Sequence, residues 1–583
     1  MKKIKDENRK RYSADFETLS LTREQIEAGQ RCYVWAWAVC DCFDINKIEY
    51  GTSIETFFKY MFSLDDGSVI YFHNQKFDGS FIISWLLKNG FKQFVGDKYD
   101  CPKNHFIAMT TGMGVFYSIT INYNNNCYLI YDSLKKLPFT VKQLAKTLGY
   151  EEGKGEIDYT EYREEGGTLS ETDKDYIRRD VQIVAKALND IYFKNGMYKL
   201  TIGSDCLKFY KSITKQFNYY FATLDPAEDQ FVRNSYRGGF CYLNPKYAGE
   251  VLTCGGIHID KNSMYPSMMD SSSKNILPVG RGKYYTGKYI KNNLYPLYVC
   301  HIKCALELKE GFIPTIQIKN NLMYKQNEYI TTTNGEVVDL YLTSIDYEML
   351  VKHYKCYLYD PDIECIDYID GYMYQGVLGL FDKYINHWYK IKEEATKEGN
   401  KALRQLAKLQ LNNLYGKMAQ NPNGSYLLFN LDENGVLKRE PIEENRETLY
   451  IPAASFITSY SRFDLIENGI QHNYDRFIYC DTDSIVLKGY EPAKNIKLDK
   501  TALGCWDCEA VWSRAKFLRQ KTYAEEVNGQ WSYKCAGLPN SNDTIKNIDD
   551  FYIGAKFENA KLMSKQVNGG IVLLPTDYVI KAH

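Results

Sequence analysis

The sequence predicts a multidomain protein of mixed α/β and α+β class. With 583 residues the chain is too long for a single hydrophobic core, so two or more domains are expected. The first part, to about residue 200, alternates β-branched and aromatic runs with helical stretches, which is typical of an α/β domain. From about residue 230 the expected strands are rich in tyrosine and antiparallel in character, and a helical block at about 380–419 interrupts them.

The expected elements follow one another without a fixed repeat or a low-complexity linker. The first part holds strand-like runs (CYVWAWAV, SVIYFHN, CYLIYDSL) and helical stretches (TFFKYMFSL, SFIISWLLKNG), and it closes with a long amphipathic helix over residues 173–191. The turn-rich NPNGS follows the helical block. The last ~45 residues are expected to form a small unit of short strands and turns.

Composition sets broad limits on the class of protein. Apolar residues make up 44% of the chain and charged residues 25%, as in ordinary soluble globular proteins. No apolar run is long enough to span a membrane, and the N-terminus has no hydrophobic signal core, so we expect a soluble protein that is not exported. The net charge of −1 gives no indication of nucleic acid, although local basic runs such as residues 514–521 are compatible with it.

The cysteines do not indicate a disulfide framework. Sixteen are scattered along the chain, and the pair Cys505 and Cys508 has no second pair at zinc-site spacing. We therefore expect reduced, mostly buried thiols in a cytosolic protein.

Four acidic residues in three segments of the first part suggest a metal-dependent site. Asp15 and Glu17 share one face of a strand, because residues i and i+2 project together. Asp78 follows a strand at its junction with a helix, and Tyr176 and Asp180 lie one helical turn apart. Asp-x-Glu alone would more often be a solvent-facing edge strand. Together, the four carboxylates suit two divalent ions that hydrolyse a phosphodiester, with the phenol of Tyr176 orienting the water.

A second acidic set lies in the later part of the chain. Asp260 ends a strand, and Asp481-Thr482-Asp483 has the form of a hairpin tip between apolar strands. Alone, Asp-Thr-Asp would be a calcium loop or a plain turn. Paired with Asp260 it predicts a two-metal site for nucleotidyl transfer, with Asp260 and Asp483 as direct ligands and Asp481 in support.

The helical block between these acidic segments carries two stripes. An apolar stripe comprises Leu403, Ala407, Leu411, Leu414 and Met418. A polar stripe comprises Lys401, Arg404, Lys408, Asn412 and Tyr415. A solvated amphipathic helix would explain both, but the basic residues of the polar stripe also suit a triphosphate. Lys392, one helical stretch earlier, could add a second phosphate contact.

These segments resemble the motifs of family B DNA polymerases. The first set matches the exonuclease motifs DxE, Nx2–3(F/Y)D and Yx3D, and the later segments are similar to motifs A (DxxSLYP), B (Kx3NSxYG) and C (YxDTDS) in the correct order. Met264 replaces the leucine of motif A, and Asn413 replaces the serine of motif B, which puts the handling of the template base in doubt. The resemblance implies a ribonuclease-H-like 3′→5′ exonuclease domain followed by a right-hand polymerase with palm, fingers and thumb.

The resemblance also implies roles in the exonuclease site. Metal ligands would be Asp15, Glu17, Asp78 and Asp180. Lys154 would approach the scissile phosphate, with an ordinary surface lysine as the alternative. The frayed 3′ end would be held by Thr18, His73, Asn74, Phe77, Phe81, Ser133 and Leu134. For Phe77 and Phe81, ordinary core packing remains an alternative.

In the polymerase site the resemblance assigns nucleotide and DNA contacts. Lys392, Lys408 and Asn412, together with Tyr415, would bind the incoming nucleotide, and Tyr265 would lie beneath its sugar and exclude a 2′-hydroxyl. Template-primer contacts are Tyr236, Gly238 and Gly239 of a YxGG motif, Lys521 and Tyr523 of a KxY motif, and Lys534. The YxGG motif of the family coordinates synthesis with proofreading. Two Mg²⁺ or Mn²⁺ ions are expected in each active site.

Two insertions indicate a branch of the family. A chain under ~600 residues with insertions at 272–379 and 420–450 resembles the protein-primed replicative polymerases of small tailed bacteriophages with linear genomes. The expected order is exonuclease 1–199, palm 200–271, first insertion 272–379, fingers 380–419, second insertion 420–450, palm 451–535 and thumb 536–583. In that family the first insertion contacts the terminal protein, and the second encloses the template, giving processivity and strand displacement.

The resemblance therefore implies a DNA-dependent DNA polymerase with a proofreading exonuclease, active in the cytoplasm of the infected bacterial host. Its expected partners are template-primer DNA, deoxynucleoside triphosphates and the terminal protein, with no membrane, as a monomer or a heterodimer with the terminal protein. A nuclease that has lost synthesis, or a non-catalytic DNA-binding descendant, would show eroded carboxylates, whereas all are present here. A reverse transcriptase or RNA polymerase would not explain the exonuclease motifs. The phage or linear element, the priming residue, the preferred metal, the fidelity and the displacement strength stay open.

Overall fold

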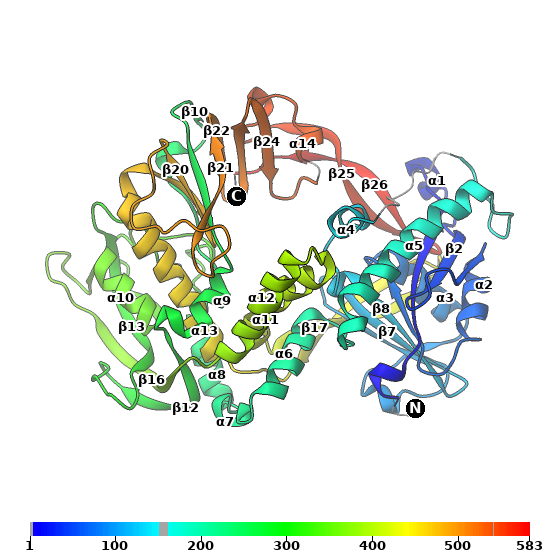
Figure 1. Ribbon diagram of the computed structural model, residues 1–583, viewed down its shortest axis with the longest axis horizontal. Coiled ribbons are helices and arrows are strands. Elements are labelled where there is room, and N and C mark those ends of the chain that lie inside the picture. Colours follow the sequence, from blue (N-terminus) through cyan, green and yellow to red (C-terminus); the bar gives the residue numbers. More distant parts are fainter. Residues whose placement is uncertain (1–3, 151–160, 540, 583) are drawn as a thin grey trace.

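An eight-stranded mixed sheet forms the N-terminal part of the protein (Figure 1). The computed structural model describes residues 4–150, 161–539 and 541–582. In spatial order the strands are β3 (Ile48–Gly51), β2 (Val34–Asp41), β1 (Arg11–Thr18), β4 (Val69–Phe72), β8 (Asn126–Asp132), β7 (Phe116–Tyr123), β6 (His105–Thr110) and β5 (Lys92–Gln93). β1 pairs antiparallel with β2 and parallel with β4, so the DxE strand lies inside the sheet and not at its edge.

Helices cover both faces of this sheet. On one face α2 (Ile54–Met61) and α3 (Asp78–Lys88) pack against Ala14 and Phe16 of β1. On the other lies α5 (Glu171–Ile191), the predicted long helix, which begins with a capping box formed by Ser170 and Asp173. Because side chains alternate along a strand, Asp15 and Glu17 face the side that α5 covers. The remaining helices of this part are α1 (Arg23–Glu27) and α4 (Val141–Leu148).

A five-stranded antiparallel sheet forms the centre of the second part. Its order is β21 (Trp506–Trp512), β11 (Gly256–Lys261), β20 (Ser484–Lys488), β19 (Phe477–Asp481) and β9 (Cys241–Leu243). α13 (Ile451–Phe463) packs on α9 (Met264–Met269) and continues into a π-helix, η7 (Asp464–Ile470). A neighbouring sheet contains β10 (Val251–Leu252), β22 (Arg514–Arg519), β23 (Thr522–Val527) and β24 (Gln530–Cys535).

The helical block forms two long helices in the middle of the molecule (Figure 1). They are α11 (Asp382–Lys397) and α12 (Lys401–Met418), and α12 packs on α6 (Ile202–Ile213). Of the predicted apolar stripe, Ala407, Leu411, Leu414 and Met418 are buried and Leu403 is half-buried; of the predicted polar stripe, Lys401, Arg404, Lys408 and Asn412 are exposed and Tyr415 is half-buried. The two predicted stripes of α12 are therefore present. Two shorter helices, α7 (Phe217–Tyr220) and α8 (Pro226–Ser235), follow α6 and lead to β9 of the central sheet.

Separate sheets occupy the two expected insertions. In the first insertion, an antiparallel sheet contains β12 (Ile276–Thr286), β16 (Asp367–Leu378), β13 (Leu297–Leu308), β14 (Val338–Thr343) and β15 (Tyr354–Tyr357). The helix α10 (Ser344–His353) packs beside this sheet. A hairpin of β17 (Asn423–Leu431) and β18 (Leu437–Asn445) leaves α12 and packs on β6 and α3 of the N-terminal part.

The prediction of short strands at the C-terminus is wrong. After the short α14 (Ser541–Thr544), β25 (Lys556–Val567) and β26 (Gly570–Val579) form a long ribbon of 12 and 10 residues. Asn559 and Pro575 lie inside this ribbon: a register shift between Phe557 and Lys561 accommodates the positive φ of Asn559, and Pro575 pairs with Leu562. The tip of the ribbon reaches the N-terminal part (Figure 1).

The tips of the two hairpins meet. Val436 forms a backbone bridge with Asn568, and the Asn568 carbonyl accepts a hydrogen bond of 2.9 Å from the N–H of Cys32. Lys88 Nζ donates to the Asn568 amide oxygen at 2.9 Å. The C-terminal ribbon therefore closes against the β17–β18 hairpin and the N-terminal part.

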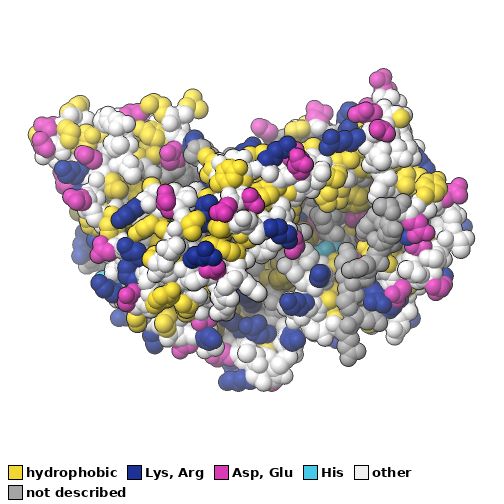
Figure 2. Space-filling model, turned by 90° about the horizontal axis from the view of Figure 1, so that it is seen from above, with side chains coloured by type: hydrophobic (Ala, Val, Ile, Leu, Met, Phe, Trp, Pro, Cys, Tyr) yellow, Lys and Arg dark blue, Asp and Glu magenta, His cyan; other side chains and the backbone are white. Residues whose placement is uncertain are grey.

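Surface charge is dispersed, in keeping with the small net charge. Figure 2 shows an outline indented between two lobes, with Lys and Arg side chains interspersed with Asp and Glu over the visible face. Within the described ranges, no helix is both long and apolar enough to cross a membrane.

Candidate active sites

Asp260 and Asp483 lie on neighbouring strands of the five-stranded sheet. Asp260 pairs with Ser484 across β11 and β20, and the N–H of Lys261 donates to the Asp483 carbonyl at 2.8 Å. Thr482 takes a left-handed conformation (φ 61°), which turns the chain tightly between β19 and β20. Partial burial and the neighbouring Asp483 raise the pKa of Asp260 to about 7. Burial, with Asp481 and Glu509 nearby, raises the pKa of Asp483 to about 6.

Asp481 is engaged by a predicted primer-contact residue. Lys521 Nζ donates to both carboxylate oxygens of Asp481, at 2.8 and 2.7 Å, and the backbone N–H of Lys521 donates to the Tyr479 hydroxyl at 3.0 Å. Tyr523 of the same motif packs beside Tyr479, and Lys534 pairs with Tyr523 across β23 and β24. The KxY residues are thus brought to the Asp-Thr-Asp turn.

Glu509 is an acidic neighbour that the sequence analysis missed. It lies in β21 at the register shift opposite His258 and Ile259, and its charge contributes to the raised pKa values of Asp260 and Asp483. No sequence motif marks it, because its approach depends on a β-bulge.

The helical block presents cations toward this acidic pair. The charge of Lys408 opposes the upward pKa shift of Asp260, which places the ammonium near the carboxylate. Lys392 is half-buried, and burial together with Arg404 and Lys408 lowers its pKa. Three cations that repel one another in this way form a ready site for a polyanion.

Tyr265 of α9 packs against Tyr415 of α12 close to the acidic pair. Their ring centroids are 4.0 Å apart with planes inclined at 30°. Both side chains are half-buried, and burial raises the pKa of each phenol. Asn412 is exposed on the same helix, three residues before Tyr415.

The YxGG residues form a loop against the Asp-Thr-Asp turn. The N–H of Thr482 donates to the Phe240 carbonyl at 2.7 Å. A β-carbon on Gly239 would come within 2.5 Å of the Thr482 hydroxyl, whereas one on Gly238 would meet nothing within 4 Å. Glycine is therefore required sterically at 239, and Gly238 leaves the backbone open on its outer side.

The predicted exonuclease carboxylates gather at one end of the N-terminal sheet. Asp78 begins α3 directly after the β4 turn, and burial together with the charge of Asp15 raises its pKa well above the usual range. Glu17, Asp78, Tyr176 and Asp180 are all buried. The side-chain Oδ1 atom of Asp78 is buried without a hydrogen-bond partner among the described residues.

A buried aspartate, Asp132, organises the expected contacts of the 3′ end. One of its oxygens accepts the N–H of Asn74 at 3.1 Å and that of Leu134 at 2.9 Å. His73 Nδ1 lies 2.9 Å from the Ser133 hydroxyl. Asn74 has a positive φ of 71°, which the Asp132 contact holds. The sequence analysis missed Asp132 because its acceptor role requires two segments to meet.

The other predicted exonuclease residues differ in exposure. Thr18 ends β1 and is half-buried. Phe77 is half-buried, whereas Phe81 is 1% exposed and packs in the core, where a β-carbon on Gly570 would touch its ring. Lys154 lies outside the described residues.

The two acidic centres are separate. Figure 1 places β20 and α5 on opposite sides of the helical block. Within residues 4–150, 161–539 and 541–582, no three His, Cys, Asp or Glu side chains come close enough to form a closed metal-ligand set. The two cysteines of the CxxC segment are likewise free thiols.

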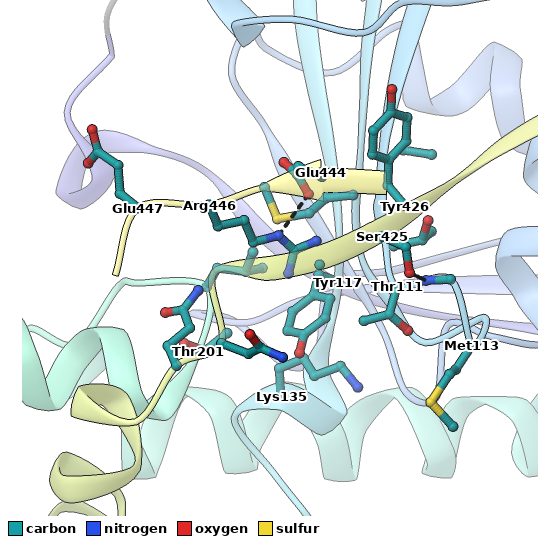
Figure 3. A pocket seen from close by; sticks show the side chains of 18 of the residues that line it. Thr111, Met113, Tyr117, Lys135, Thr201, Ser425, Tyr426, Glu444, Arg446 and Glu447 are labelled. Atoms are coloured by element: carbon teal, nitrogen blue, oxygen red, sulfur yellow. Dashed lines mark hydrogen bonds and ion pairs between the residues drawn. The ribbon is translucent and has the colours of Figure 1, made fainter. Parts of the chain in front are cut away.

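A large cavity lies beside α12 and the β17–β18 hairpin (Figure 3). It has a volume of about 1870 Å³. Its walls come from residues 93–96, 107–113, 200–204, 423–426 and 443–447, and from Asn413, Gly416 and Lys417 of α12. Lys135 and Arg446 project into it, and Arg446 is paired with Glu444 at 2.7 Å. Asn413, the departure from motif B, thus lines the cavity.

Comparison with known proteins agrees with this arrangement. The family described as DNA polymerase type B, organellar and viral, matches residues 59–175 and 153–502. The DNA polymerase of Bacillus phage phi29 is 40% identical over 98% of this chain and 99% of its own length. That of Streptococcus phage Cp-1 is 34% identical over 98% of both chains. Phi29 DNA polymerase in a ternary complex with primer-template DNA and incoming nucleotide superposes with a TM-score of 0.88 at 39% identity, covering 98% of this chain and 100% of that one.

The fold and the family match define a type B DNA polymerase. Within that family, the chain belongs to the protein-primed polymerases of phi29-like phages. The predicted fold class and the predicted enzyme class, a DNA polymerase of the type that carries a 3′→5′ exonuclease on the same chain, are confirmed. Type B polymerases generally use divalent metals.

Proposed function

We propose that the chain replicates a linear phage genome through two centres, one for synthesis and one for proofreading. The observation that carries the proposal is the pairing of Asp260 and Asp483 on adjacent strands, with Lys408 close to Asp260. Burial and neighbouring carboxylates raise the pKa of both aspartates, and such perturbed groups are typical of functional sites.

Divalent cations fit both centres. Burial and neighbouring carboxylates raise the pKa values of Asp260 and Asp483, and Asp78 has an unpartnered oxygen; both features mark donor sets that a cation would stabilise. We assign two Mg²⁺ or Mn²⁺ ions to each centre, held by Asp260 and Asp483 in one, and by Asp15, Glu17, Asp78 and Asp180 in the other. Bound there, the ions would activate the attacking oxygen and stabilise the leaving one.

In the synthetic centre the chain's own residues bind and orient the nucleotide. The triphosphate is bound by Lys392, Lys408 and Asn412. The charges of the two lysines converge where no internal carboxylate neutralises them fully. Tyr265 packs against Tyr415 with its ring tilted by 30°, so its ring is held in place to lie beneath the deoxyribose. Lys521, held by Asp481, presents its ammonium beside the expected primer terminus.

In the proofreading centre the residues around Asp132 hold the single-stranded 3′ end. Thr18, His73, Asn74, Ser133 and Leu134 supply polar contacts, and Phe77 offers a half-exposed ring for base stacking. Tyr176 orients the water, and Lys154 is assigned to the scissile phosphate. Phe81 would act by supporting Phe77, whose ring lies 5.6 Å away.

The cavity beside α12 and the β17–β18 hairpin is assigned to the template strand. The expected exonuclease domain, palm, fingers and second insertion each contribute to its wall. We propose that this opening admits only the single template strand, so that incoming duplex would be opened at its mouth. The contact between the two hairpin tips would then enclose the DNA behind the site, which suits processive synthesis with strand displacement.

The same proposal implies which partners the chain binds. Phi29 DNA polymerase has been solved with primer-template DNA and with incoming nucleotide. We propose both for this chain, together with a terminal protein that docks on residues 272–379. The polymerase would act in the host cytoplasm, alone or as a heterodimer with that protein. The domain boundaries given above remain predictions.

Primed-circle extension tests the proposal. Purified wild type with Mg²⁺ and four dNTPs should extend a primed single-stranded circle past full length. Asp483→Ala should lose extension yet keep 3′→5′ degradation of single strands, and Asp15→Ala with Asp78→Ala should do the reverse. Degradation without extension by the wild type would contradict the synthetic centre.

A further inference from the structure

One hydrogen-bonded pair joins the strand of Asp260 to the strand of Tyr523. His258 Nδ1 lies 3.0 and 3.2 Å from the two carboxylate oxygens of Glu525. A carboxylate can only accept, so Nδ1 carries the hydrogen and donates it. Because β11 belongs to the five-stranded sheet and β23 to the neighbouring four-stranded sheet, this pair connects the two sheets.

Each partner projects from the same face of its strand as a residue assigned to the synthetic centre. The pairing of β11 with β20 is in unbroken register, and so is the pairing of β23 with β24. In a regular strand, residues i and i+2 share a face. His258 therefore lies on the face of Asp260, and Glu525 lies on the face of Tyr523.

The pair is buried where the two sheets pack together. His258 is 5% exposed and Glu525 is 8% exposed. Val486, which pairs with His258 across β11 and β20, belongs to an apolar cluster that also contains Phe517 of β22. The ring centroids of His258 and Tyr523 are 6.2 Å apart. Solvent therefore competes little for this hydrogen bond.

A buried polar pair of this kind contributes more to geometry than to stability. Replacing such a pair by apolar side chains of similar volume is often neutral for stability, because the relieved desolvation offsets the lost attraction. Apolar packing is non-directional, whereas a bond from one nitrogen to two oxygens fixes both distance and orientation. The alignment of β11 with β23 thus depends on a directional bond between His258 and Glu525.

We infer that His258 is a positioning residue for nucleotide addition, which through Glu525 holds the strand of Asp260 in alignment with the strand of Tyr523. The bond aligns the primer terminus, expected at Tyr523, with the nucleotide and metal ions expected at Asp260. The inference rests on the function proposed for these two residues. A misplacement of about 1 Å between reacting groups can cost about 100-fold in rate, so a small shift between the strands is measurable.

Single-turnover addition of one nucleotide by His258→Leu and His258→Asn tests the inference. Leucine removes the donor, whereas the amide nitrogen of asparagine can occupy the position of Nδ1. The rate constant should fall about ten-fold in His258→Leu and return to within about three-fold of the wild type in His258→Asn. The dNTP concentration at half-maximal rate should change by less than about two-fold in both, because Lys392 and Lys408 lie on α11 and α12.

The amplitude of the same reaction reports the fraction of active protein, so it separates positioning from folding. A folding role would lower the amplitude and the Tm of His258→Leu but leave the rate constant unchanged, and this result would overturn the inference. Degradation of single-stranded DNA should keep the wild-type rate, because the predicted exonuclease carboxylates lie in the N-terminal part of the protein. Equal slowing of degradation and addition would also overturn it.

The double variant His258→Leu with Glu525→Met covers the case in which His258→Leu alone fails to fold. It leaves no buried carboxylate without its donor, so the Tm should return toward that of the wild type. The rate constant should remain about ten-fold low, since apolar contacts do not fix the orientation of the strands. Recovery of the rate together with the Tm would mean that the pair only stabilises the fold, and would overturn the inference.

His353→Leu is the matched control. His353 and Glu467 form another buried histidine–glutamate pair, in which Nε2 lies 2.6 Å from a carboxylate oxygen and joins α10 to the π-helix η7. Its loss should lower the Tm yet leave the rate constant within about two-fold of the wild type. A loss of rate as large as in His258→Leu would show that any missing buried pair slows addition, and would overturn the inference. Absence of addition by the wild type would instead contradict the proposed function, on which the inference rests.

Discussion

Lys521 holds both oxygens of the Asp481 carboxylate, at 2.8 and 2.7 Å. This places Asp481 in the role of an anchor for Lys521, while Asp483 carries no such partner within the described residues and faces Asp260. The two aspartates of one turn thus have different partners.

The two aspartates should respond differently to loss of charge. Asp483→Asn should abolish nucleotide incorporation, because it removes a proposed metal ligand. Asp481→Asn should lower incorporation by about ten-fold, since it releases Lys521 but leaves both ligands in place. Single-turnover incorporation by the two variants checks this order. Equal loss in both would contradict the separate roles.

Tyr265 should control the choice of sugar. Tyr265→Val removes the ring that lies on Tyr415 and should raise ribonucleotide incorporation relative to deoxynucleotide by about 100-fold, whereas Tyr265→Phe should keep the discrimination. The ratio of kcat/KM for dCTP and CTP measures it. Unaltered discrimination in Tyr265→Val would show that another group excludes the 2′-hydroxyl.

Asp132 should matter for proofreading alone. Asp132→Asn weakens the acceptor that holds Asn74 and Leu134, so degradation of single-stranded DNA should fall about ten-fold with polymerisation unchanged. Asp66→Asn is the matched control, because Asp66 accepts the N–H of Cys127 near the opposite end of β8. A similar loss in both variants would point to general destabilisation of the sheet.

Lys319 should give stability a specific pH dependence. Burial, with Arg237 and Arg462 nearby, lowers the pKa of Lys319 to about 7. Between pH 7 and about 10.4 the unfolded chain then binds the extra proton, so this lysine destabilises the fold most at low pH and least at high pH. Relative to wild type, Lys319→Met should therefore gain most in Tm at pH 6–7 and lose that advantage toward pH 9. Lys325→Met, an exposed lysine of the same segment, should show a flat difference.

The contact between the hairpin tips should control processivity. Gly569 has a φ of 92°, and a β-carbon there would lie 2.1 Å from the Cys32 carbonyl, so Gly569→Ala should displace the tip of the ribbon. We expect several-fold fewer nucleotides per binding event in a trap assay, with single-nucleotide addition retained. Gly554→Ala introduces a similar backbone strain (φ 100°) with nothing within 4 Å, and should leave processivity near that of the wild type.

Local motifs made most of the fold and the acidic centres predictable. DxE, YxDTDS and the stripes of α12 depend on residues close in sequence, and the structure places them as expected. Contacts between segments that are distant in the sequence could not be predicted from it. His258 and Glu525 are 267 residues apart, and Glu509 approaches the acidic pair only through a bulge. The long C-terminal ribbon was misread because a bulge absorbed residues that usually end strands.

On the proposal that the contact between Asn568 and Val436 encloses the DNA, entry and exit differ for linear and circular substrates. The end of a linear DNA can pass through a closed ring of protein, but a circular DNA has no end that could do so. Circular substrate must wait for the tips to part, and once they close again it is topologically captured. Loading should then be the slow event on circles, while departure depends on the opening of a backbone bridge and little on the screening of charges.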